Sequence, residues 1–278
     1  MEYRNSASDA DCCRDCRAFG RPRHCYKLVK GNDVILLRSL VFVIWLYGTM
    51  ATLAILGLPV LFLPRRVTAS LIRVYARLIL FGLRWICGIR VELKGHEHIR
   101  DGAQIVAGKH QAMLDVFIPF LFFRDPVVIM KRELLWYPFL GWYALKSSQI
   151  PIDRDGGAQT MRRMLKAAKS RVLSGAGRQL VIFPEGTRTE PGAPPAYKPA
   201  GIRAFYKNLD LPIIPVATNS GHCWPAHGLI RKPGIVVYEV LPEIDAGLSQ
   251  KDMLATLQAR LEAGSNALLT RGESNQNE

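Results

Sequence analysis

The sequence predicts an α/β protein with a mostly parallel central sheet flanked by helices, preceded by an N-terminal membrane-associated helical segment. Two observations indicate this organisation. From residue 91 onward, short apolar stretches of strand length alternate with helical ones, which is typical of a parallel sheet covered by helices. Before them, residues 39–63 form 25 consecutive residues without a charged side chain. The chain therefore divides into an apolar N-terminal part and a larger α/β part.

The composition is that of a folded protein with a basic N-terminal third. Of 278 residues, 49% are hydrophobic and 22% charged, which excludes a disordered chain. The formal net charge is +14, and residues 1–90 supply +9 of it. A basic surplus suits nucleic acid, an anionic membrane surface or acidic partners. Because the basic third is also strongly apolar and the sequence has no recognisable nucleic-acid-binding motif, we expect membrane lipids, not nucleic acid, as partners.

Three segments are predicted along the chain. Residues 1–33 form a polar leader rich in Cys and Arg, which we expect to be disordered. Residues 34–90 form membrane-embedded and interfacial helices, and residues 91–278 form the α/β domain. Within the leader, Cys13-x-x-Cys16 imitates half of a zinc site, although free thiols in a loose segment explain the same residues.

The uncharged run 39–63 reads SLVFVIWLYGTMATLAILGLPVLFL. About 20 apolar residues suffice to cross a hydrocarbon core of about 30 Å, so we expect this run to enter a membrane. A buried core helix is the alternative. Basic residues flank the run on both sides and are more numerous after it. That asymmetry favours a cytoplasmic location for the larger α/β part. We expect a bacterial-type inner (plasma) membrane, and a helix that enters the membrane and returns also fits the run.

A second helical stretch is predicted over 67–89. Arg66, Arg73, Arg77 and Arg84 recur at spacings of 7, 4 and 7, which places all four on one helix face. The remaining positions are mostly aliphatic or aromatic. This pattern is typical of a helix lying in the membrane interface, while a soluble amphipathic helix packed on the domain is the alternative.

The α/β part predicts six strands and five helices. The expected strands cover 103–108, 126–130, 149–152, 179–183, 212–217 and 235–241. The expected helices cover 113–123, 133–146, 157–174, 199–208 and 249–269. Ligands of open parallel sheets bind outside the carboxyl ends of the strands. We therefore expect the chemistry to lie just after residues 108, 130, 152 and 183.

His110 and Asp115 follow the first expected strand in an H-x4-D spacing. A strand end that carries the imidazole and a helix start that carries the carboxylate can meet. A carboxylate fixes the imidazole tautomer and stabilises the imidazolium, so His110 is a candidate general base. The alternative is a purely structural role for Asp115 as a helix N-terminal cap.

The run Phe183-Pro-Glu-Gly-Thr-Arg188 follows the fourth expected strand. Its glycine permits close backbone approach to a ligand, and its arginine supplies a planar cation suited to phosphate. Glu185 would need partners at the end of an apolar strand. Another arginine, Arg154, follows the strand at 149–152. Prolines bracket the strand at 212–217, which predicts a wall of the sheet and not a central strand.

These segments together resemble the glycerolipid acyltransferases of the 1-acyl-sn-glycerol-3-phosphate (lysophosphatidate) acyltransferase family. The resemblance covers about residues 90–245 and rests mainly on H-x4-D with FPEGTR. It implies transfer of an acyl chain from a thioester, acyl-CoA or acyl carrier protein (acyl-ACP), to the sn-2 hydroxyl of lysophosphatidic acid, giving phosphatidic acid. It also implies that no metal or organic prosthetic group takes part.

The same resemblance implies roles for individual residues. His110 would be the base and Asp115 its orienting partner. The remaining residues would bind the acceptor: Glu185, Gly186, Thr187, Arg188, Arg154 and Lys131. The chemistry agrees independently, because a thioester is already activated and needs a base for the attacking alcohol more than a nucleophilic serine. The sequence accordingly shows no obvious G-x-S-x-G elbow.

Three alternatives remain open at the level of sequence. The acceptor could be glycerol-3-phosphate, another lysophospholipid or a lyso-aminolipid. The protein could be a non-catalytic membrane protein that binds anionic lipid, although such a protein has no need of a base and its orienter. The basic residues of the helix 157–174 could hold CoA phosphates or an acidic ACP, or could form a solvated face.

Overall fold

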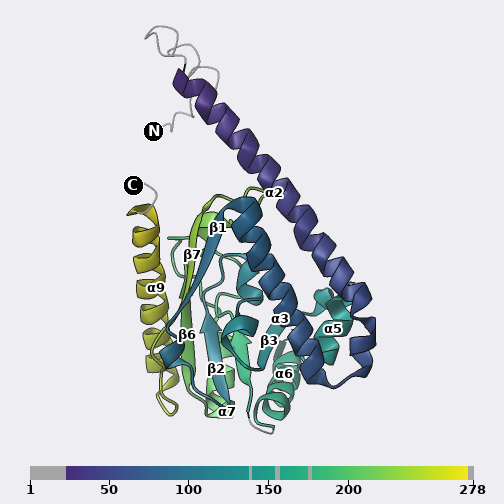
Figure 1. Cartoon of the computed structure of the whole chain (residues 1–278). Helices are drawn as coiled ribbons and strands as arrows, with labels where there is room; N and C mark the ends of the chain where they lie inside the picture. The colour runs from purple at the N-terminus through teal and green to yellow at the C-terminus, as the bar shows by residue number, and fades with distance from the viewer. Residues whose placement is uncertain (1–22, 138–139, 154–156, 175–176, 275–278) are drawn as a thin grey trace.

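The computed structural model describes residues 23–137, 140–153, 157–174 and 177–274, and its core is one sheet (Figure 1). The described strands follow the order β1-β7-β6-β2-β5-β3-β4. Strands β2 to β6 are mutually parallel, while β7 is antiparallel to β6 and parallel to β1. The predicted mostly parallel α/β fold is therefore confirmed. The strand bounds are β1 (Ile89–Lys94), β2 (Gln104–Gly108), β3 (Pro126–Lys131), β4 (Ile150–Ile152), β5 (Gln179–Ile182), β6 (Ile213–Thr218) and β7 (Gly234–Val240).

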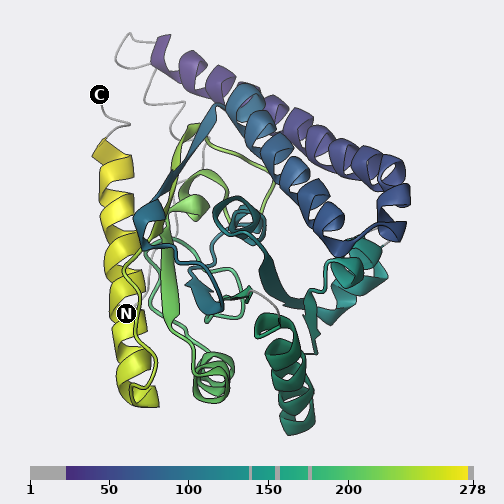
Figure 2. The ribbon, with the colours of Figure 1, turned by 60° about the horizontal axis from the view of Figure 1, so that its bottom comes forward.

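Helices cover both faces of the sheet, as Figure 2 shows from a second direction. On one face, α6 (Gly157–Val172), α7 (Pro199–Leu209) and α9 (Gln250–Ser274) bury residues against Ile105 and Ala107 of β2. On the other face, the N-terminal helices contribute buried residues to a hydrophobic cluster that includes Val106. The short helices α4 (Pro119–Phe122) and α8 (Ser220–Cys223) contribute to the same cluster. Alternate side chains of β2 thus enter opposite cores, as expected for a strand buried on both faces.

The N-terminal part is a helical hairpin that packs on the sheet domain. Helix α2 (Arg23–Leu56) is followed by a 3-10 turn η1 (Leu58–Phe62), helix α3 (Arg65–Gly82) and a π turn η2 (Leu83–Cys87). Helix α2 contains no proline, and it ends just before Gly57 and Pro59. It therefore starts within the segment predicted to be a leader and stops short of residue 63. The remaining leader, with Cys13 and Cys16, lies outside the described residues.

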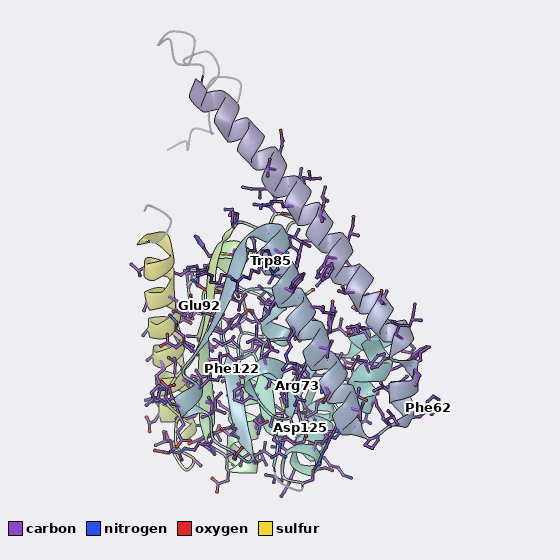
Figure 3. All side chains as sticks on the ribbon, in the orientation of Figure 1. Phe62, Arg73, Trp85, Glu92, Phe122 and Asp125 are labelled. Carbon is purple, nitrogen blue, oxygen red and sulfur yellow. The ribbon has the colours of Figure 1, made fainter. Side chains whose placement is uncertain are left out.

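Among the described residues, one helical segment, Asp33–Leu56 of α2, is long and apolar enough to cross a membrane by length and composition, and most of it is not buried within the protein. Figure 1 shows the N-terminal half of α2 standing clear of the sheet domain. In Figure 3, Phe62 projects outward at the turn between α2 and α3, where it is 90% exposed. Further large apolar side chains are exposed on this hairpin: Leu36, Leu37, Val41, Ile44, Tyr47, Ile55, Leu56, Val67, Val74, Phe81 and Trp85.

The predicted arginine face is present on α3 and the adjoining η2. Arg66, Arg77 and Arg84 are exposed, whereas Arg73 is half-buried and donates to the carbonyl of Arg124. Arg65, which precedes that face, forms a bidentate ion pair with Asp125 at the start of β3, with N–O distances of 2.6 and 2.7 Å. The hairpin is thus tied to the sheet domain by charge as well as by apolar packing.

Several predicted elements have different limits in the structure. Strand β1 was not predicted; it is an edge strand in which Arg90, Glu92 and Lys94 alternate with apolar residues. The helix predicted over 113–123 is a 3-10 turn η4 (Met113–Val116) followed by α4, since Pro119 begins a new helix. The helix predicted over 133–146 is likewise a 3-10 turn η5 (Arg132–Trp136) and a helix α5 (Leu140–Lys146).

The prediction that the proline-bracketed strand forms a wall is wrong. Strand β6 lies inside the sheet, paired with β2 on one side and β7 on the other. Pro215 is tolerated because a bulge lies beside it. Two residues of β6 separate its pairs Ile213–Ile244 and Val216–Val240, while three residues separate the same pairs on the β7 side.

Candidate functional site

The site begins where β2 leaves the sheet. The Lys109 N–H still donates to the Val216 carbonyl, which extends the ladder by one residue, and His110 comes next. The chain then turns into η4, which places Asp115 back beside the imidazole. His110 Nδ1 lies 3.0 Å from Asp115 Oδ2. The predicted H-x4-D pair is therefore in contact.

Asp115 is buried and is held by five hydrogen-bonding groups. Its Oδ2 accepts from the backbone N–H groups of Gln111 and Ala112, at 2.6 and 2.8 Å, in addition to His110. Its Oδ1 accepts from Ser220 Oγ at 2.7 Å and from the Tyr238 hydroxyl at 2.6 Å. Burial, followed by the Asp115 charge, raises the pKa of Tyr238 well above its ordinary value, so the tyrosine stays a donor. An acceptor-only Asp115 requires the His110 proton on Nδ1, which leaves Nε2 able to accept one.

Residues in and next to the FPEGTR loop contact both the backbone and the ring of His110. Phe183 stacks on the imidazole, with ring centroids 4.3 Å apart. The His110 N–H donates to Glu185 Oε2 at 2.9 Å, and the His110 carbonyl accepts from the Thr189 N–H at 2.8 Å. The two predicted motifs, 75 residues apart in sequence at His110 and Glu185, thus form one unit.

A buried charge cluster lies beneath this unit. Lys109 Nζ lies 2.8 Å from Glu185 Oε1 and 2.6 Å from Glu262 Oε1 of α9. Burial alone would lower the pKa of Lys109, but the two carboxylates outweigh that effect and raise it above 10.5, so the lysine is charged. The partners that Glu185 needed at an apolar strand end are therefore Lys109, Thr189 and the His110 N–H.

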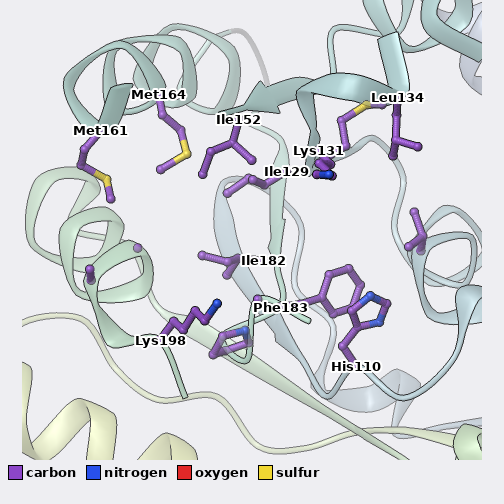
Figure 4. A pocket seen from close by; sticks show the side chains of 16 residues that line it. His110, Ile129, Lys131, Leu134, Ile152, Met161, Met164, Ile182, Phe183 and Lys198 are labelled. Atoms are coloured by element: carbon purple, nitrogen blue, oxygen red, sulfur yellow. The ribbon is translucent and has the colours of Figure 1, made fainter. Parts of the chain in front are cut away.

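A cavity of about 390 Å³ opens beside His110 (Figure 4). Its walls come from the carboxyl ends of β2, β3, β4 and β5 and from α6 and α7, as predicted for a parallel sheet. Most of the lining is apolar, and Lys131, Lys198 and His110 are its side chains that can carry positive charge. The apolar lining includes Val116, Ile129, Met130, Leu134, Ile152, Met161, Met164, Ile182 and Phe183.

The predicted acceptor-binding residues occupy different places. Lys131 and Gly186 line the cavity. Gly186 has a φ of +66°, which favours glycine, and a Cβ there would stand 3.1 Å from the Lys198 side chain. Thr187 and Arg188 are exposed and lie outside the lining residues, whereas Glu185 is buried beneath the loop. Arg154 lies outside the described residues.

Several residues of the site were not predicted from the sequence. Lys198 precedes α7 and reaches the cavity, as Figure 4 shows. Ser220 and Tyr238 hold Asp115 from α8 and β7, more than 100 residues away. Lys109 adjoins His110, and its place on a strand flanked by buried residues was a signal that a charge partner would be needed. Among the described residues, no group of three or more His, Cys, Asp or Glu could hold a metal ion.

The comparisons with known proteins first define a class. The family model described as Acyltransferase matches residues 90–219, which contain both the H-x4-D pair and the FPEGTR loop. A 1-acyl-sn-glycerol-3-phosphate acyltransferase of Pseudomonas aeruginosa is 32% identical over 189 residues, covering 68% of this chain and 72% of the relative. The protein is therefore an acyltransferase.

The chain belongs to the 1-acyl-sn-glycerol-3-phosphate acyltransferase family. A relative of that name from Limnanthes alba is 31% identical over 165 residues, and this match covers 58% of the chain and 57% of the plant protein. The chain thus matches little more than half the length of that relative. The fold is shared with the crystal structure of the 1-acyl-sn-glycerophosphate (LPA) acyltransferase PlsC from Thermotoga maritima, with a TM-score of 0.69 at 20% identity, over 84% of this chain and 97% of that one.

Proposed function

We propose that this protein transfers a fatty acyl chain from a thioester donor to the sn-2 hydroxyl of 1-acyl-glycerol-3-phosphate and so makes phosphatidic acid. The observation that carries the proposal is the contact between His110 and Asp115 at the mouth of an apolar cavity. The names of the relatives support the acceptor. The donor is acyl-CoA or acyl-ACP, and the reaction needs no metal or prosthetic group because the thioester is already activated.

The proposed chemistry uses His110 as the general base. His110 Nε2 takes the proton of the acceptor hydroxyl while the hydroxyl oxygen attacks the thioester carbonyl carbon. The tetrahedral intermediate collapses, the C–S bond breaks, and the imidazolium returns its proton to the departing thiolate. Asp115 stabilises the imidazolium, and the stacked Phe183 holds the ring in place. A protein that only bound lipid would have no need of a base and a carboxylate that orients it.

The cations of the site suit a phosphate monoester. Lys131 and Lys198 come from different elements, β3 and the segment before α7, and both line the cavity. We assign the acceptor phosphate to these two lysines, with Arg188 of the loop after β5 and Arg154, which lies outside the described residues, as further ligands. The apolar remainder of the wall, which includes Met161 and Met164, suits a hydrocarbon chain.

The N-terminal hairpin is proposed to hold the enzyme in the membrane that supplies its substrates. The exposed apolar side chains of α2 would enter the hydrocarbon, and the arginines of α3 would meet anionic head groups. The basic surplus after residue 63 favours a cytoplasmic catalytic domain at a bacterial-type inner membrane. On α6, Arg162, Arg163, Lys166 and Lys169 are exposed and could receive CoA phosphates or an acidic ACP.

A matrix of donors and acceptors tests this proposal with the purified full-length protein. Thiol release from acyl-CoA, or ACP release from acyl-ACP, should depend on added lysophosphatidic acid, and phosphatidic acid should form. Glycerol-3-phosphate, lysophosphatidylcholine and a lyso-aminolipid should react poorly. Preference for any of these over lysophosphatidic acid would reassign the acceptor.

The base is tested by His110→Ala, which should lower kcat at least about 100-fold, the lower range for general-base catalysis, with little change in substrate binding. Asp115→Asn should also be impaired, because an amide can hold Nδ1 in the wrong tautomer. Near-normal turnover of folded His110→Ala protein would remove His110 from the chemistry.

A further inference from the structure

The last helix of the chain reaches the catalytic loop through one carboxylate. Glu262, in the middle of α9, places Oε1 2.6 Å from Lys109 Nζ and 2.8 Å from the hydroxyl of Tyr197. Residue 262 lies well beyond the segment 90–219 that the family model matches. Its contacts therefore come from outside the segment that the family model matches.

Lys109 is the group through which this carboxylate acts. Its side chain is 5% exposed and stands between Glu262 and Glu185, with the Tyr197 ring centroid 5.7 Å from Nζ. A buried ammonium held by two carboxylates has a fixed position, because moving toward one lengthens the charge-assisted hydrogen bond to the other. With Glu262 absent, Glu185 alone would set the position of Nζ.

Glu185 passes this constraint to the imidazole. Its Oε1 contacts Lys109 and the Thr189 hydroxyl, and its Oε2 accepts the His110 N–H at 2.9 Å. Lys109 and His110 are also consecutive in the chain. A shift of Lys109 therefore moves the backbone of His110 from two directions, through the peptide bond and through the Glu185 carboxylate.

We infer that Glu262 is a positioning residue for His110, acting through Lys109 and Glu185. It does not line the cavity beside His110, and its function is to hold Lys109 so that Nε2 of the imidazole faces the acceptor hydroxyl. A displacement of about 1 Å at a reacting group can lower a rate by about 100-fold, so a partial loss of position has a measurable effect on turnover. The inference rests on the proposed role of His110 as the base.

Glu262→Gln tests this with little change of shape, since it removes the charge and keeps the side-chain length. We expect kcat to fall about tenfold, the KM for donor and for acceptor each to stay within about twofold, and the thermal midpoint to stay close to wild type. Asp252→Asn is the matched control, because it removes one negative charge from the exposed first turn of the same helix. It should leave kcat unchanged.

Tyr197→Phe provides a second, milder test that keeps all three charges. It removes only the hydroxyl that donates to Glu262, so kcat should fall less than in Glu262→Gln. In the double variant the two losses should not multiply, because both changes act on the same carboxylate. Should Glu262→Gln fail to fold, the Tyr197→Phe variant alone tests the inference: a lower kcat supports it, and an unchanged kcat contradicts it.

Three results would overturn the inference. They are wild-type kcat in folded Glu262→Gln, an equal rise of both KM values together with a lower thermal midpoint, and fully multiplicative losses in the double variant. Failure of the base itself is distinguished by His110→Ala. If His110→Ala is inactive while Glu262→Gln is normal, only the role of Glu262 is withdrawn.

Discussion

At the scale of single residues, the site is organised by carboxylates that are already satisfied within the protein. Asp115 orients the imidazole, and Glu185 and Glu262 neutralise Lys109. The cations left facing the cavity are lysines, Lys131 and Lys198, whereas the arginine of FPEGTR is exposed outside its wall. This separation of roles makes different predictions for lysine and arginine substitutions.

Lys198→Met should raise the KM for lysophosphatidic acid about tenfold or more, because a hydrogen bond to a charged group contributes about 1.5–3 kcal/mol. The KM for the acyl donor should hardly change. Steady-state kinetics with lysophosphatidic acid and with monoacylglycerol, which lacks the phosphate, check this: monoacylglycerol should react poorly and lose little more. Lys207→Met, on the exposed face of α7, is the control. Equal losses of kcat/KM with both acceptors would show that Lys198 does not bind the phosphate.

Arg188→Lys keeps the charge but loses the planar fork that binds two phosphate oxygens. If Arg188 swings onto the acceptor phosphate, this variant should also raise the KM for lysophosphatidic acid and leave the donor KM nearly unchanged. Because Arg188 is exposed in the free enzyme, the thermal midpoint should not move. A lower midpoint with equal harm to both substrates would assign it a structural role.

At the scale of elements, ion pairs and close helix packing connect the N-terminal hairpin to the sheet. Asp125, just before β3, pairs with Arg65 of α3 and with Arg178 beside β5. Burial alone would raise the pKa of the Asp125 carboxyl, but the two arginines outweigh it and hold the pKa below its ordinary 3.8. This carboxylate therefore links three elements only while it is ionised.

Because folding lowers the pKa of Asp125, its ionised carboxylate stabilises the folded protein above about pH 4. This stabilisation is lost as the pH falls through the pKa that Asp125 has in the folded state. Asp125→Asn should therefore lower the thermal midpoint at pH 7. The difference from wild type should shrink below about pH 4, as wild-type Asp125 also becomes protonated. Thermal unfolding at several pH values measures this. A difference independent of pH would mean that Asp125 acts through packing and not through its charge.

The packing of α2 on α3 depends on Gly82. A Cβ at this position would lie 2.5 Å from Nε1 of Trp45, whose indole donates to the Leu78 carbonyl at 2.9 Å. Gly82→Leu should push the helices apart and cost about 1–3 kcal/mol, as overpacking typically does. Thermal unfolding in detergent and limited proteolysis between the helices should report it. Gly48→Ala is the control, since a Cβ there meets nothing within 4 Å.

How far the sequence predicts these elements depends on what stabilises each one. Strands β2, β3 and β5 are largely buried and read as apolar runs, so their predicted bounds were confirmed to within one residue. The H-x4-D contact was predictable because both residues are local to one strand end. Tyr238, Ser220 and Glu262 were not, because their contacts depend on the tertiary packing of distant segments. The interior position of β6 was not predicted, because the bulge that accommodates Pro215 cannot be recognised from the sequence.

At the scale of the whole molecule, the hairpin belongs to the same core as the sheet. Phe42, Leu46, Ile79 and Leu83 are buried in one cluster with Val106 and Ile214. Phe42 also meets Trp224 edge to face, with centroids 5.4 Å apart. The N-terminal hairpin and the sheet domain therefore share one hydrophobic core, and they cannot be separated without exposing it.

Deletion of residues 1–90 should consequently yield insoluble protein and not a soluble enzyme. The full-length protein should stay with membranes in high salt and at alkaline pH and be released by detergent, because its exposed α2 residues bind by apolar burial. Sedimentation after each wash measures this. Release by salt alone would mean that only the basic residues hold the protein on the membrane.

The position of β1 has a consequence for synthesis of the chain. The first strand pairs with the last, Ile89 with Gly234, and makes its ladder to no other described strand. About 140 residues must be translated between them, which takes about 7–28 s at 5–20 residues per second. During that interval α2 and α3 can already form, while β1 has no strand with which to pair. Glu262 emerges later still, so the hairpin is complete before the ribosome has finished the helix whose carboxylate contacts Lys109.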